Sequence, residues 1–150
     1  MAKKRSQRMG VVHKVAQLEE QRAADALATV RTQLQHAQQQ LEQFIHYRAD
    51  YMQNSPHKQN QTRVNPREFI NFNNFILQLD DVIERQRDVI ARIDEQYQRA
   101  VQIWQQKQRY QQKIGELKDK AHVTEQLTME KRLQAQIDDA SARKMTRVES

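Results

Sequence analysis

The sequence predicts an all-α fold, a long two-helix antiparallel coiled-coil hairpin. Only two Gly and two Pro occur among 150 residues, too few for the turns of a sandwich, a barrel or a βαβ array. The hydrophobic fraction is 37%, below the roughly 45–50% that fills a globular core. The 25 Gln residues, and the many Lys, Arg, Glu, Ala and Leu residues, favour helices. This composition argues for long, thin helices and against an enzyme.

The first helix is predicted from about residue 11 to 53 by an a/d heptad seam. Its seam residues alternate at steps of three and four, and they are Leu27, Val30, Leu34, Ala37, Leu41, Phe44, Arg48 and Tyr51. Such spacing puts one column of side chains on a single helix face that packs against a partner helix. Val11, Val15 and Leu18 keep the spacing but lie out of phase, so we predict a stutter near Ala23.

The second helix is predicted from residue 66 to about 145, after a loop at residues 54–65. Asn65 suits the N-cap, Pro66 the first helical position and Glu68 the third. The a positions are Phe69, Ile76, Ile83, Ile90, Tyr97 and Trp104, and the d positions are Phe72, Leu79, Gln86, Ile93, Ala100, Lys107 and Ile114. A third column, the g positions, consists of Phe75, Val82, Val89, Ile103 and Tyr110. The apolar stripe is therefore wider than a two-helix coiled coil needs.

A short loop between two seams predicts that the helices pack antiparallel. Folding the chain about this loop places residue 53 opposite residue 66, and residue 11 opposite about residue 108. The second helix is then expected to continue beyond residue 108 without a partner. We interpret residues 1–150 as a single coiled-coil domain, with the loop of residues 54–65 at the tip, a basic tail at residues 1–10 and a short tail at residues 146–150.

Charge is unevenly distributed along the chain, whose formal net charge is +6. Residues 1–14 carry five basic and no acidic residues, whereas residues 15–95 carry nine basic and twelve acidic ones. Residues 96–150 carry eleven basic and seven acidic residues. Because the two ends of a hairpin meet, we expect one strongly basic end, which can steer docking to an acidic site.

No arrangement of residues points to catalysis, metal binding or nucleotide binding. The chain has no Cys, which excludes disulfides and thiolate metal sites. Its five His residues form no i,i+4 pair, and the adjacent Asp pairs at 80–81 and 138–139 diverge around their helices. Gly10 and Gly115 lie too far apart for a phosphate loop. We expect no catalytic residue, metal, cofactor or small-molecule ligand, and a cytoplasmic location, because neither an apolar run of roughly 18 residues nor a signal peptide is present.

Aromatic residues gather near the predicted tip. They are Phe44, Tyr47 and Tyr51 near the end of the first helix, and Phe69, Phe72 and Phe75 at the start of the second. One interpretation is simple core packing beside the turn. A two-helix hairpin cannot bury a three-column stripe, however, so we favour an exposed apolar patch that binds a partner.

Two stretches of the chain resemble the flagellar FliJ family of type III export proteins. They are QQQLEQFIHYRADY at residues 38–51 and REFINFNNFILQLDDVIERQ at residues 67–86. The resemblance covers roughly residues 11–145, including the position of the loop and the polar, Gln-rich second helix. Paired tyrosines before the loop and Phe-x-x-Phe-Ile-x-x-Leu after it carry the similarity.

This resemblance implies a non-enzymatic component of the flagellar type III protein export apparatus. Members of the family form a coiled coil similar to the central stalk of rotary ATPases. They bind the hexameric export ATPase in its central pore, contact the transmembrane export gate and handle export chaperones, at the periphery of the inner membrane. The family's gate-binding surface maps onto Gln40, Phe44, Tyr47, Tyr51, Phe75, Leu79, Val82 and Gln86.

The basic end supplies a hypothesis for ATPase binding. It comprises Lys3, Lys4, Arg5, Arg8, Arg143, Lys144 and Arg147, which we expect to enter an acidic or carbonyl-lined pore. Solubilising tails are the alternative interpretation of the same residues.

Two other functions are open at this point. A basic nucleic-acid-binding coiled-coil module would contact phosphates through the N-terminal arm. Against it, the basic residues of the second helix are interleaved with acidic ones, and no leucine zipper follows a basic region. A structural spacer without a specific partner is the third alternative.

Overall fold

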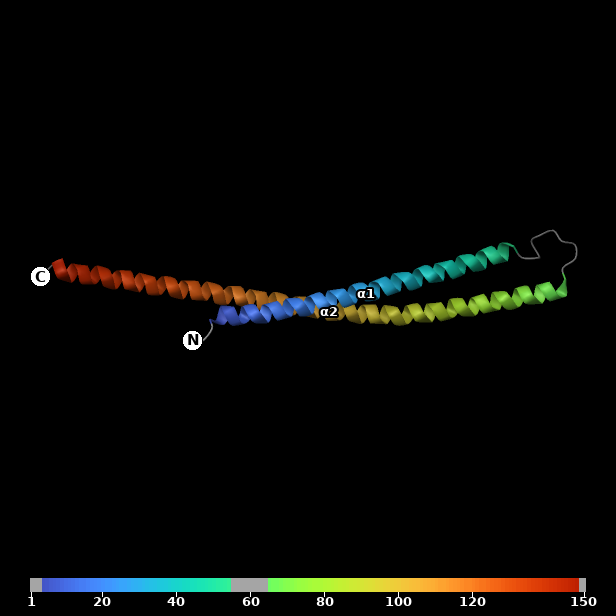
Figure 1. The fold of residues 1–150 in the computed structure, drawn as a ribbon, viewed down its shortest axis with the longest axis horizontal. Coiled ribbons are helices and arrows are strands. Elements are labelled where there is room, and N and C mark those ends of the chain that lie inside the picture. The colour runs from blue at the N-terminus through green and yellow to red at the C-terminus, as the bar shows by residue number, and fades with distance from the viewer. Residues whose placement is uncertain (1–3, 55–64, 149–150) are drawn as a thin grey trace. The chain divides into compact units, whose positions relative to one another are not determined.

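The computed structural model describes residues 4–54 and 65–148, and it is all-α as predicted. Helix α1 spans Arg5–Gln53 and helix α2 spans Pro66–Val148 (Figure 1). Within the described ranges only Lys4, Asn54 and Asn65 lie outside a helix, and no strand is present. The two long helices pack against each other. The predicted loop at residues 54–65 falls, except for its two end residues, outside the described residues.

The start of α2 is confirmed as the sequence predicts. The Asn65 side-chain oxygen Oδ1 accepts a hydrogen bond from the Arg67 N–H at 3.1 Å, which satisfies one of the free amides of the first turn. The Phe69 N–H donates to the Asn65 carbonyl at 3.1 Å and closes the first helical turn. Helix α2 ends at Val148, close to the predicted end at about residue 145.

Helix α1 begins at Arg5 and not at about residue 11, so residues 5–10 of the predicted tail are helical. The cause is a cap supplied by α2. The Ser6 N–H donates to Glu125 Oε1 at 3.0 Å, and the Ser6 hydroxyl donates to Glu125 Oε2 at 2.6 Å. The first turn of α1 contains no acidic residue of its own. The Glu125 carboxylate therefore provides the negative charge that a helix N-terminus favours.

The chain divides into two compact units, each containing part of both helices. The aromatic unit is Ala23–Trp104, and the terminal unit combines Met1–Arg22 with Gln105–Ser150. In each unit, the contacts pair rising residue numbers on α1 with falling numbers on α2, so the helices are antiparallel in both.

In the aromatic unit the predicted seam is confirmed on both helices. Every seam residue predicted between Leu27 and Tyr51 on α1, and between Phe69 and Trp104 on α2, is buried or half-buried. The core is a cluster of Phe72, Ile76 and Leu79, against which Tyr51 and Phe75 pack.

The polar members of this seam have partners. Arg48, the one charged residue of the α1 seam, donates from Nε to Asp80 Oδ1 at 2.6 Å. The Gln86 amide donates to the Ala37 carbonyl at 2.9 Å. Both side chains at the helix interface therefore have a hydrogen-bond partner on the opposite helix.

In the terminal unit the seam predicted on α1 and its stutter are wrong, whereas the α2 seam residues Lys107 and Ile114 are half-buried and buried as predicted. Val11, Val15 and Leu18 are exposed, at 59%, 51% and 60%. The residues turned toward α2 are instead Ser6, Met9, His13, Ala16 and Glu20, and Ala23 continues this line at the start of the aromatic unit. Their spacing is in phase with Leu27, so the heptad continues without interruption. The apolar periodicity predicted the wrong face of α1 as the one that packs on α2, because small and polar residues occupy the seam in this unit.

Polar pairs replace apolar packing in most of this unit. His13 Nε2 lies 3.1 Å from Gln111 Oε1, and the Lys107 ammonium donates to Glu19 Oε2 at 3.1 Å. In the described part of the terminal unit, Ala16 and Ile114 are the buried apolar residues.

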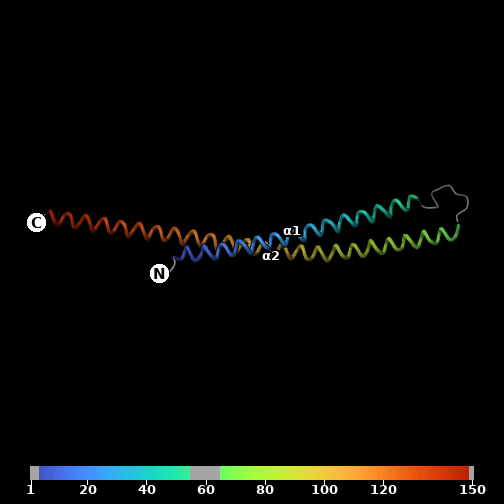
Figure 2. The backbone as a smooth tube through the Cα atoms, in the orientation of Figure 1, coloured from blue at the N-terminus to red at the C-terminus, as the bar shows by residue number. Residues whose placement is uncertain are grey.

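The predicted register is wrong in both units. Pairing residue 53 with residue 66 puts Arg48 opposite residue 71 and residue 11 opposite about residue 108, whereas Arg48 contacts Asp80, His13 reaches Gln111 and Ser6 reaches Glu125. Helix α1 therefore covers α2 up to Glu125, and every residue from Gln126 to Val148 is exposed. Figure 2 shows the start of α1 beside α2, with the C-terminal part of α2 continuing beyond it.

The close approach of the helices explains a glycine in the middle of α2. A Cβ added at Gly115 would lie 3.0 Å from His13 Nε2, which is tighter than ordinary van der Waals contact. Glycine costs about 1 kcal/mol relative to alanine in a helix interior. The imidazole of His13 occupies the space that a larger residue would need.

We expect Gly115→Ala to reduce hydrogen-exchange protection of the amides of residues 10–20, because the added methyl displaces His13. In a His13→Ala background Gly115→Ala should increase protection, by up to about 1 kcal/mol of opening free energy. The clash with His13 is then absent, and the higher helix propensity of alanine is the effect that remains. An equal gain in both backgrounds would show that His13 does not require the glycine.

The cap of α1 depends on the ionisation of Glu125. The Ser6 hydroxyl and then the Ser6 amide lower the pKa of Glu125 below its ordinary value of 4.5, and the charges of Lys4 and His122 lower it further, against the opposing effect of burial. Because the folded-state pKa is lowered, the carboxylate stabilises the start of α1 above pH 4.5. That contribution is lost as the pH falls through the lowered value.

We therefore expect Glu125→Gln to weaken hydrogen-exchange protection of the amides of residues 6–10 at pH 6 to 7, and to have little effect well below the pKa of Glu125. The two proteins are compared at each pH so that the intrinsic exchange rate cancels. A difference that persists unchanged into acid would mean that the carboxylate charge does not support the cap.

Candidate interaction surfaces

An aromatic cluster joins the end of α1 to the start of α2 within the aromatic unit. The Tyr51 ring stacks on Phe72 with centroids 5.0 Å apart and an interplanar angle of 9°, and it tilts against Phe75 at 4.5 Å. Tyr47 meets Phe75 edge to face, with centroids 6.2 Å apart. Ring pairs in these geometries stabilise beyond the area they bury, so the cluster holds Tyr47 in a defined place.

The rest of the predicted gate-binding surface continues along the same side of the unit. Gln86 donates to Gln40 Oε1 at 3.3 Å. Gln40 and Tyr47 are seven residues apart on α1, and Phe75 and Val82 are seven apart on α2, so each pair lies on one helix column. The structure thus places Gln40 against Gln86, and Tyr47 and Tyr51 against Phe75, with Leu79 in the core cluster on which Tyr51 and Phe75 pack.

Exposure divides the eight residues into three groups. Tyr47 and Val82 are exposed, at 55% and 38%, whereas Leu79 is 8% exposed. Gln40, Phe44, Tyr51, Phe75 and Gln86 are half-buried. A partner can reach Tyr47 and Val82 directly, while Leu79 belongs to the core beneath them.

The predicted basic end is divided into two clusters. Lys4, Arg5 and Arg8 lie at the start of α1, next to Glu125, whereas Lys3 lies outside the described residues. The other three residues, Arg143, Lys144 and Arg147, lie near the end of α2. Arg143 is 18 residues beyond Glu125, about 27 Å along a helix. The clusters are apart because α2 extends well past the start of α1 in this unit.

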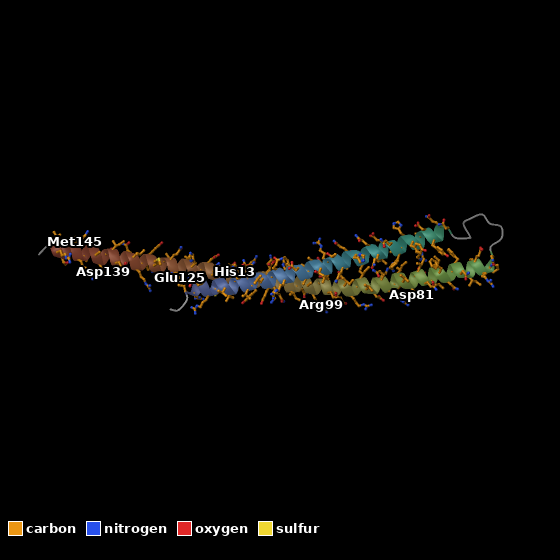
Figure 3. The ribbon with its side chains drawn as sticks, viewed as in Figure 1. His13, Asp81, Arg99, Glu125, Asp139 and Met145 are labelled. Carbon is orange, nitrogen blue, oxygen red and sulfur yellow. The ribbon has the colours of Figure 1, made fainter. Side chains whose placement is uncertain are left out.

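Figure 3 shows the same separation through labelled side chains. Glu125 lies beside the start of α1, whereas Asp139 and Met145 lie on the part of α2 that α1 does not cover. The sequence analysis did not identify Glu125 as a residue that contacts α1. Its heptad position could have indicated this, because Glu125 is at an a position, in phase with Trp104 and Gln111 on the α2 seam.

Within residues 4–54 and 65–148, no group of three or more His, Asp and Glu residues could hold a metal ion. Neither described helix is long and apolar enough to cross a membrane.

The family model for the flagellar FliJ protein matches residues 5–150. The chain belongs to the FliJ family. The match begins at Arg5, where α1 begins, and it confirms the resemblance drawn from the two sequence stretches. FliJ proteins are non-catalytic components of flagellar protein export, and this chain is accordingly a flagellar export component. A search of curated proteins finds no match to the chain.

Proposed function

We propose that this FliJ protein is a non-enzymatic coiled coil that binds the flagellar export ATPase hexamer, couples it to the transmembrane export gate and handles export chaperones. Its place is the cytoplasm, at the periphery of the inner-membrane export apparatus. Family membership supports this role. The observation that carries it is the exposed pair Tyr47 and Val82, held above a packed aromatic core.

Gate binding is assigned to the side of the aromatic unit that contains Gln40, Tyr47, Phe75 and Val82. Tyrosine is enriched at binding hot spots because it offers a rigid ring with a polar group at its tip. Here the Tyr47 ring is oriented by Phe75, and the Gln40 side chain by Gln86. A preorganised surface loses less conformational entropy when a partner binds.

ATPase binding is assigned to the basic cluster at the end of α2. Arg143, Lys144 and Arg147 lie on a stretch where α2 has no helix packed against it. A single helix has a diameter of about 10–12 Å with its side chains, so it enters a narrower pore than a helix pair does. The cluster at the start of α1 lies where both helices are present.

The gate-binding surface is tested by a pull-down with the cytoplasmic part of the export gate protein. Tyr47→Ala combined with Val82→Ala should weaken binding about tenfold or more. These two residues are preferred to Leu79, because truncating a buried leucine destabilises the fold itself by about 2–5 kcal/mol.

Ile70→Ala with Leu77→Ala is the matched control, since both side chains are exposed aliphatics at b positions of the same helix. The control should bind as the wild type does. Wild-type binding by the Tyr47 and Val82 variant, or equal loss in the control, would contradict the assignment.

The ATPase-binding cluster is tested by co-purification with the export ATPase. Replacing Arg143, Lys144 and Arg147 with Gln should weaken binding by roughly tenfold or more at low salt, because exposed charge pairs contribute little singly but act together. The same replacement at Lys4, Arg5 and Arg8 should leave binding within about twofold. If the first variant still bound the ATPase, or if the second variant lost more binding than the first, the assignment of ATPase binding to the end of α2 would be wrong.

A further inference from the structure

A second line of residues runs along the start of the chain on the face opposite the α1 seam. Its members are spaced alternately by four and three residues, and they are Lys4, Arg8, Val11, Val15, Leu18 and Arg22. We call this line the outer stripe. All six side chains are exposed. Aliphatic residues occupy its middle, and basic residues occupy both ends.

The outer stripe reverses the usual distribution of side chains. In this segment Ser6, His13 and Glu20 are turned toward α2, whereas Val11, Val15 and Leu18 are more than half exposed. Aliphatic residues at i, i+4 and i+7 on an exposed helix face are typical of a surface that another structure covers. Packing against α2 does not account for them.

The charge of this face limits the kind of partner that can bind the outer stripe. Arg8 and Arg22 lie on the stripe and Lys14 lies beside it, all exposed. The acidic residues of the segment, Glu19 and Glu20, are half-buried, and Glu19 is paired with Lys107. The outer face is therefore basic. A second copy that presents the same stripe would place like charges in contact, so the partner surface is anionic.

We infer that the outer stripe docks on an anionic lipid bilayer. The three aliphatic side chains enter the headgroup region, and the basic residues at the two ends contact lipid phosphates. An interfacial helix combines these two contributions, apolar burial and attraction to anionic lipid. The inference concerns the terminal unit alone and does not depend on the proposed partners.

The position of the aliphatic residues favours a flat surface over a partner helix. Val12 and Val15 line a shallow groove with Tyr110 of α2, where a helix could lie. A helix in that groove leaves Val11 and Leu18 in water, because they lie farther around α1. The aliphatic stripe also spans only two turns, short of the three to four heptads that a coiled-coil partner requires.

The test measures binding of the purified chain to vesicles. The wild type should bind vesicles of phosphatidylcholine with phosphatidylglycerol, bind pure phosphatidylcholine weakly, and dissociate as salt rises. Replacing Val11, Val15 and Leu18 with Gln should weaken binding about tenfold or more. Replacing Arg8, Lys14 and Arg22 with Gln should weaken it roughly a hundredfold. Circular dichroism verifies that each variant remains helical.

Leu127, Leu133 and Ile137 provide the matched control. They lie in the same unit, and their exposure of 53%, 53% and 59% is similar to that of the stripe. Their replacement with Gln should leave vesicle binding unchanged. Equal loss in this control would mean that any exposed aliphatic residue suffices, and the inference would be wrong.

A site-specific probe complements the affinities. Because the chain has no cysteine, Val15→Cys can carry a single polarity-sensitive dye, with Leu133→Cys as its control. Anionic vesicles should shift the emission of the first to the blue and leave the second unchanged. Equal binding to neutral vesicles, an absent shift at residue 15, or capture of an acidic amphipathic peptide by the stripe without vesicle binding would each overturn the inference.

Discussion

A helix that packs against one other helix can bury only one of its faces, and this constraint explains most of what the chain displays. It accounts for the low apolar content, since a single seam needs few large side chains. It also means that an apolar residue off the seam has no partner within the chain. The g column beside Tyr47 and the outer stripe of α1 are two places where such residues collect.

The same seam is built from different chemistry in the two units. In the aromatic unit Phe72, Ile76 and Leu79 form a buried cluster, and apolar burial of this kind is the dominant favourable term in folding. In the terminal unit the helices meet through Ala16, Ile114 and polar pairs. Exposed ion pairs contribute about 0–1 kcal/mol each. The pairing in the terminal unit is therefore specified by shape and hydrogen bonding more than by apolar area.

The sequence predicted those parts of the fold that local rules and apolar periodicity control. The Asn65 cap depends on residues adjacent in the chain, and the seam from Leu27 to Tyr51 consists mainly of apolar side chains. The eight residues of the gate-binding surface came from family resemblance, and the heptad positions placed them on or beside the seam. The predicted register did not bring them together, because it puts Arg48 opposite residue 71 whereas Arg48 pairs with Asp80.

The predictions that were wrong share a physical cause, because each of these features depends on residues of the opposite helix. Helix α1 starts early because its cap is Glu125, 119 positions away in sequence. His13 lies toward α2 because Gln111 is within hydrogen-bond distance and Gly115 leaves space for the ring, and Glu19 does so because Lys107 donates to it. The basic end is divided because α1 and α2 differ in length. None of these facts is visible in the periodicity of one helix alone.

The capping of α1 by Glu125 also couples the start of α1 to anything that binds this carboxylate. A ligand that turns the carboxylate out of the geometry of its two hydrogen bonds with Ser6 competes with the cap. A ligand that captures Glu125 on α2 therefore favours release of the start of α1, and with it the helical order of the outer stripe. By thermodynamic reciprocity, whatever fixes the start of α1 lowers the affinity of that ligand by the same factor.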